Sequence, residues 1–189
     1  MINDKFKMIN LDTDKAWLKG VRRSPSPHCD DRPYGVDIEL LVIHGISLPP
    51  GKFGGPYIDQ LFTHKLDKNA DPYFVKIADL RVSAHLLIRR TGELIQYVSF
   101  QKRAWHAGES SFRGRCCCND FSIGIELEGC DNIPYTNEQY VQLGEVVAIL
   151  RQAWPVLTDD RIVGHCDIAP GRKTDPGPVF DWGRLYGGV

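Results

Sequence analysis

The sequence predicts an α/β (α+β) protein of one domain, in which helices flank a central mixed β-sheet. Three features predict this class: a segment at residues 39–45 that contains an unbroken apolar run, an alternating segment at 121–129, and a long amphipathic segment at 136–154. An unbroken apolar strand is typical of burial on both faces of a sheet, which requires other elements to cover those faces. The 189 residues, 42% of them hydrophobic, are enough for one domain with a substantial core.

The charge balance excludes several classes of partner. The formal net charge is −1, so no basic field attracts nucleic acid or an anionic membrane. No apolar run reaches the length of a transmembrane helix, and the charged N-terminus has no apolar signal core. We therefore expect a cytoplasmic monomer with neither a nucleic-acid nor a membrane partner.

The six cysteines favour a reduced protein. Three of them are consecutive, which suits a disulfide framework poorly, and they lack the paired CxxC spacing of a structural zinc site. They are Cys29, Cys116, Cys117, Cys118, Cys130 and Cys166.

The first half of the chain predicts one strand and a long excursion. Residues 1–37 are polar and mixed, and we expect them to form an N-terminal arm that lies on the domain. Residues 1–23 of this arm precede the region that resembles a known family. Residues 39–45 follow as a buried strand. Residues 52–80 include a short helix that Pro56 can start. An excursion of this length beside a site is a candidate wall or lid.

The middle of the chain predicts a hairpin and another strand. Residues 82–89 and 93–100 read as two strands joined at Thr91-Gly92. A loop over 103–120 leads to the strand at 121–129. In that strand Ser122, Gly124 and Glu126 share one face, and the apolar residues share the other.

The last third predicts the main helix and a shaped loop. Thr136 and Gln139 fit a capping box at the start of the helix over 136–154. Ile162-Val163 reads as the end of a buried strand, and residues 164–178 follow as a loop rich in Pro and Gly. Residues 181–186 predict a short terminal helix.

Two histidines and one carboxylate suit a metal site. His44 and His165 lie at predicted strand ends, and Asp175 lies in the loop that follows His165. If they converge, they leave a fourth position for water, which is the pattern of a catalytic zinc site. Spacing alone does not show convergence, and a histidine at a strand end is more often a packed or capping residue.

Further residues suit catalysis or substrate contact. The small neighbours of Glu126 on its strand face leave space for that carboxylate to reach a water, although a solvated face carrying Glu126 and Glu128 is the alternative. Lys173 can meet an oxyanion, and Trp105 can stack on a sugar ring, while a surface lysine and a core tryptophan are the plainer interpretations.

The remaining histidines show no such partner. We interpret His28, His64 and His85 as structural or surface residues. His106 is left open because it adjoins Trp105 in a loop that contains glycine. Strand alternation would point Cys166 away from a metal.

Several motifs resemble one known family, the zinc N-acetylmuramoyl-L-alanine amidases, over residues 24–182. The motifs occur in the family's order. They are Leu41-Val42-Ile43-His44, Ser83-Ala84-His85, Arg103-Ala104-Trp105-His106-Ala107-Gly108, Asn119 to Gly129, and His165 to Pro178.

The resemblance implies one Zn²⁺ per chain, held by His44, His165 and Asp175. It makes Glu126 the catalytic carboxylate and Lys173 the residue that stabilises the transition state. The implied fold is that of the amidases and peptidoglycan recognition proteins, with residues 1–189 as one amidase domain.

Three more positions match expected substrate contacts, and one departs from the pattern. Trp105, Arg81 and Arg172 match positions that contact sugar and peptide in the family. Similar members usually have Asn after the first ligand histidine, whereas this chain has Gly45, which removes one hydrogen bond to substrate. Asp175 separates the chain from relatives that use Cys there.

The implied reaction is zinc-dependent hydrolysis of the amide between 1,6-anhydro-N-acetylmuramic acid and L-alanine of the stem peptide. The implied substrates are cytosolic anhydro-muropeptides formed in cell-wall recycling. Two alternatives stay open: an amidase of the same family that acts on intact peptidoglycan, and a non-catalytic module that binds muropeptides.

Overall fold

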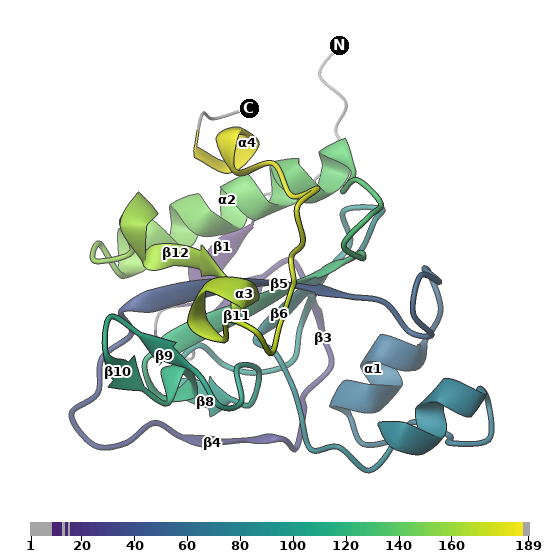
Figure 1. Cartoon of the computed structure of the whole chain (residues 1–189). Helices are drawn as coiled ribbons and strands as arrows, with labels where there is room; N and C mark the ends of the chain where they lie inside the picture. Colours follow the sequence, from purple (N-terminus) through teal and green to yellow (C-terminus); the bar gives the residue numbers. More distant parts are fainter. Residues whose placement is uncertain (1–8, 13, 15, 187–189) are drawn as a thin grey trace.

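The computed structural model describes residues 9–12, 14 and 16–186, so the first eight residues of the predicted N-terminal arm lie outside the described part. Within the described residues, a six-stranded mixed sheet forms the centre of the fold, as the sequence predicts (Figure 1). Its strand order is β12-β5-β11-β6-β7-β3. The strands are β3 (Arg22–Arg23), β5 (Leu40–Ile46), β6 (Leu86–Ile88), β7 (Leu94–Gln96), β11 (Ser122–Glu128) and β12 (Ile162–Gly164).

The direction of the strands decides where a site can form. Strands β12, β5, β11 and β6 run parallel to one another, while β6 and β7 pair antiparallel across the predicted turn at Thr91-Gly92. The carboxyl ends of four neighbouring strands therefore meet at one edge of the sheet. In open α/β sheets, ligands bind outside this edge.

One face of the sheet is covered by α2 (Asn137–Ala153), and α4 (Trp182–Tyr186) lies beside α2 (Figure 1). The predicted capping box is present, since Thr136 accepts from the backbone N–H of Gln139 and the Gln139 side chain accepts from Thr136 N–H. Alternation along the strands sends Leu41, Ile43 and Ile125 into the core beneath α2.

The opposite face carries the site and two smaller clusters. One cluster lies under α1 (Tyr57–Phe62) and the 3-10 helix η1 (Pro72–Lys76), which form the excursion after β5. The other surrounds Leu40 and Val42 and includes Ile168 of α3 (His165–Ile168). The segment after β12 therefore starts as one helical turn, whereas the sequence predicted a loop there.

Short ladders complete the fold. They are β1 (Asn10–Asp12) with β2 (Trp17–Lys19), β4 (Cys29–Asp31) with β8 (Lys102–Ala104), and β9 (Ser111–Phe112) with β10 (Arg115–Cys116). The 3-10 helices η2 (Cys118–Asp120) and η3 (Asp159–Arg161) precede β11 and β12. The described part of the predicted arm thus forms the β1–β2 ladder, the edge strand β3 and the strand β4, which pairs with β8.

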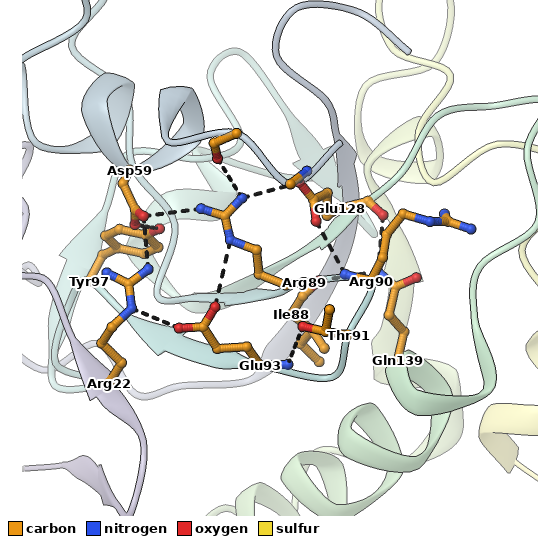
Figure 2. A network of polar contacts seen from close by, with 12 residues as sticks. Arg22, Asp59, Ile88, Arg89, Arg90, Thr91, Glu93, Tyr97, Glu128 and Gln139 are labelled. Atoms are coloured by element: carbon orange, nitrogen blue, oxygen red, sulfur yellow. Dashed lines mark hydrogen bonds and ion pairs between the residues drawn. The ribbon is translucent and has the colours of Figure 1, made fainter. Parts of the chain in front are cut away.

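A buried ionic network fastens the start of the excursion to the sheet (Figure 2). The Arg89 guanidinium lies 3.1 Å from Glu128 Oε1 and 3.1 Å from Asp59 Oδ2, and it donates to the carbonyl of Gly55 at 2.8 Å. Glu128 also accepts from Gly54 N–H at 2.6 Å. Because Glu128 belongs to β11 and Asp59 to α1, the network joins the helix to the central strand.

No helix within the described residues is long and apolar enough to cross a membrane.

Candidate active site

Three neighbouring parallel strands bring the predicted site residues together at their carboxyl ends. His44 of β5 and Glu126 of β11 are directly paired in the register of the two strands and share the face opposite α2. His165 comes directly after β12, as the first residue of α3. Asp175 lies in the loop after α3. Its backbone carbonyl accepts a hydrogen bond from the backbone N–H of Cys166 at 2.9 Å, which holds the loop beside His165.

The side chains of His44, His165 and Asp175 converge on one point. The two Nδ1 atoms lie 2.9 Å apart, and Asp175 Oδ2 lies 3.3 Å from His44 Nδ1 and 3.1 Å from His165 Nδ1. Ligands about 2.0–2.2 Å from a tetrahedral zinc ion are separated by about 3.3 Å, so this triangle has the size of one face of such a site. The donors, two imidazole nitrogens and one carboxylate oxygen, are among those that zinc accepts.

The electrostatics of the cluster favour a cation. Burial lowers the pKa of His44 to about 4, so that its imidazole is neutral and keeps a lone pair at neutral pH. Burial alone would raise the pKa of Asp175, but the close contacts of its carboxylate with the His165 and His44 rings outweigh burial and hold that pKa well below its usual range. The site therefore presents a neutral imidazole at His44 beside a negative carboxylate at Asp175.

Glu126 is buried beside this cluster. Its exposed fraction is 9%, and among the described residues its Oε2 atom has no hydrogen-bond partner. Burial and the nearby Asp175 charge raise the pKa of Glu126 well above its ordinary value, while Lys173 opposes that shift. Glu128 is buried too, at 2% exposure, so the alternative of a solvated face carrying both carboxylates is wrong.

A cleft of about 790 Å³ opens over the site. His44, His165, Asp175 and Glu126 all line it, and so does Lys173.

The cleft also shows where the predicted substrate contacts lie. Trp105 and Arg172 line it, whereas Arg81 is exposed and lies outside the lining, between the lining residues Leu80 and Val82. The excursion over 52–80 contributes to the wall through Leu61, Phe62, Tyr73, Ile77 and Leu80.

His106 occupies the space above Gly124, next to Glu126 on the same strand. A Cβ atom on Gly124 would lie 2.4 Å from Cγ of the His106 ring, so the ring rests directly on the glycine backbone. The expectation that small residues leave open space is therefore wrong directly over Gly124, although Glu126 does line the open cleft. The motif around Trp105 held a signal for this contact, but only the fold shows which strand the ring meets.

The cysteines stay apart from the metal cluster. All six are free, and Cys166 is not among the residues whose ligand atoms converge.

The comparisons with known proteins agree with this fold. The family pattern described as N-acetylmuramoyl-L-alanine amidase matches residues 34–178. The chain therefore belongs to this family of amide-hydrolysing enzymes.

Within the family, the chain is similar to proteins named AmpD. It is 61% identical to the 1,6-anhydro-N-acetylmuramyl-L-alanine amidase AmpD of Salmonella typhimurium, over 91% of each chain. A crystal structure of a Se-Met AmpD derivative superposes with a TM-score of 0.89 at 60% identity, covering 93% of this chain and 96% of the other. AmpDh3 from Pseudomonas aeruginosa, solved in complex with anhydromuramic pentapeptide, matches at 31% identity with a TM-score of 0.57, over 82% of this chain and 61% of the other.

Proposed function

We propose that this chain is a zinc-dependent 1,6-anhydro-N-acetylmuramyl-L-alanine amidase. It hydrolyses the amide that joins anhydro-N-acetylmuramic acid to L-alanine of the stem peptide. We further propose that residues 1–189 act as one domain, as a monomer in the cytoplasm, in cell-wall recycling and without a nucleic-acid or membrane partner.

One observation carries this proposal. The three donor atoms of His44, His165 and Asp175 form a triangle of zinc-site dimensions, and the unpartnered oxygen of Glu126 lies beside it in the same cleft. An unpartnered carboxylate oxygen in a buried site is costly unless a water or a substrate satisfies it. The cleft accommodates such a group.

The proposed mechanism assigns one role to each residue. His44, His165 and Asp175 would hold zinc, which polarises the scissile carbonyl and makes a water reactive at neutral pH when it is bound. Glu126 accepts the proton of the attacking water and returns it to the leaving amine. A carboxyl group with a raised pKa suits this exchange at neutral pH better than an ordinary one.

Lys173 and the walls of the cleft complete the proposal. The Lys173 side chain lines the cleft beside Glu126, where its ammonium can offset charge on the oxyanion. Trp105 and Arg172 line the same cleft and would contact sugar and peptide. Arg81 is proposed as a contact from the family pattern, at the rim of the cleft.

The substrate class follows from the relatives. Close relatives are named as amidases of 1,6-anhydro-N-acetylmuramyl-L-alanine, and AmpDh3 was solved in complex with anhydromuramic pentapeptide. A cleft of about 790 Å³ is large enough for a sugar with a short peptide, since ligand pockets run about 300–1,000 Å³.

A paired assay tests the proposal. The purified protein is incubated with an anhydro-muropeptide or with intact sacculi, and free stem peptide is measured by mass spectrometry. We expect rapid release from the anhydro-muropeptide and much slower release from sacculi. Binding without release would instead indicate a sensing module, and faster release from sacculi would indicate an amidase of intact peptidoglycan.

A further inference from the structure

The far sides of both ligand histidines meet consecutive residues of one loop, which follows β8. His44 and His165 turn their Nδ1 atoms toward Asp175 and their Nε2 atoms away from it. The Nε2 atom of His44 lies 2.9 Å from Nδ1 of His106, and that of His165 lies 3.2 Å from the carbonyl oxygen of Ala107. The loop therefore supplies the second hydrogen-bond partner of each ligand.

A chain of hydrogen bonds runs from His44 through His106 and Ser122 to the backbone. The groups at its two ends determine which atom carries each proton. A histidine that binds a metal through Nδ1 carries its proton on Nε2, so His44 donates to His106 Nδ1. The proton of His106 then lies on its Nε2 atom, 3.1 Å from Ser122 Oγ. Ser122 in turn donates to the carbonyl oxygen of Cys118 at 2.5 Å. Each donor meets an acceptor, and the chain ends on the backbone.

The surroundings hold the His106 ring in this orientation. The ring rests on Gly124, where any side chain would collide with it. The Asn119 side-chain oxygen accepts from the backbone N–H of His106 at 3.1 Å and of Ala107 at 2.8 Å. These contacts fix the two acceptors of the loop, His106 Nδ1 and the Ala107 carbonyl, relative to β11.

We propose that His106 is a positioning residue for the metal site, acting through His44. This inference rests on the zinc site of the proposed function. His106 orients the His44 ring and keeps its proton on Nε2, so that Nδ1 is free to bind zinc. Such outer partners of metal-ligating histidines typically contribute about 10–100-fold to metal affinity.

Zinc affinity, measured by competition with a chelator, tests the role directly. His106→Leu removes the acceptor, and we expect the zinc Kd to rise about 10–100-fold. His106→Asn places an amide oxygen near the former Nδ1 position, and we expect it to restore most of the affinity. A purely structural role of the ring would not be rescued by the smaller asparagine. Melting of the metal-free variants is measured in parallel to confirm that they fold.

A second pair of variants tests the contact between the His106 ring and the Gly124 backbone. Gly124→Ala should raise the zinc Kd, because its new Cβ displaces the ring, but should add nothing in a His106→Ala background. Gly144→Ala, in the middle of α2 with nothing within 4 Å of the new Cβ, is the matched control and should leave the Kd unchanged.

Imidazole ¹⁵N NMR gives a readout that needs no zinc. We expect His106 to carry its single proton on Nε2 in the metal-free and zinc-loaded protein. A proton on Nδ1 of His106, or an unchanged zinc Kd in folded His106→Leu, would overturn this inference and leave the proposed function intact. Failure of the wild type to bind zinc would overturn the proposed function and this inference with it.

Discussion

Replacement of Glu126 by glutamine tests the proposed chemistry most specifically. The variant distinguishes three roles of Glu126: a general base, a zinc ligand and a surface residue without a function in catalysis. The two side chains are nearly isosteric, but a neutral amide cannot accept the proton of the attacking water. General acid–base catalysis contributes about 10²–10⁴-fold, so kcat should fall by about that factor. Zinc content and substrate affinity should stay unchanged, because Glu126 lies outside the triangle of donor atoms.

The same variant makes a prediction about stability in the metal-free protein. Burial raises the pKa of Glu126 above its ordinary value of 4.5, so in the window above that pH the folded state binds more protons than the unfolded state. The free energy of unfolding therefore falls as pH rises through this window. Glu126→Gln removes the titrating group. Its metal-free form should be more stable than metal-free wild type near neutral pH, and the advantage should shrink as pH falls toward about 4.5.

Three measurements decide the outcome: kcat on an anhydro-muropeptide, zinc per chain, and urea unfolding of the metal-free proteins across pH. A drop in zinc affinity would make Glu126 a ligand. A normal kcat would remove it from the mechanism, and equal stability of both metal-free proteins at every pH would refute the account of its burial.

Further predictions concern the rest of the cleft and its support. Lys173→Met should lower kcat by about 10²-fold with zinc content unchanged, as expected for loss of an oxyanion partner; an unaltered kcat would exclude that role. Arg89→Met should lower the free energy of unfolding in urea by about 3 kcal/mol, since it strands a buried carboxylate, whereas Arg22→Met, 43% exposed in the same network, should cost less than about 1 kcal/mol. Equal effects would contradict this assignment. Hydrogen exchange at saturating product should show new protection over residues 63–81, whereas 54–59, already fastened to the sheet, should be protected in both states.

Sequence reasoning worked best where a signal is local. The capping box at Thr136 is complete within four residues, and the apolar run at 39–45 marks a central strand by itself. The turn at Thr91-Gly92 likewise joins the two strands that its residues predict. In each case the residues that carry the signal are neighbours in the chain.

Contacts between distant segments escaped prediction. Arg22 pairs with Ile95 at the edge of the sheet, and nothing near Arg22 marks it as strand. Glu128 alternates with apolar residues as an exposed carboxylate would, yet Arg89, 39 residues away, pairs with it in the interior. The pairing depends on which strands become neighbours.

The candidate site shows the same division. The sequence placed His44 and His165 at strand ends and Asp175 in the following loop, and only the family resemblance implied that the three converge. The sequence did not predict that His106 reaches over Gly124 to the far side of His44, because a glycine in a strand does not identify what approaches it.

The central claim is that the cluster of His44, His165 and Asp175 holds the zinc ion on which amide hydrolysis depends. Elemental analysis of the purified chain, combined with turnover before and after chelation, tests it most directly. We predict one zinc per chain, loss of activity on chelation, and recovery when one equivalent of zinc is returned. Cys166→Ser should keep its zinc, whereas Asp175→Ala should lose it. Full activity in a preparation shown to be free of metal would contradict the claim.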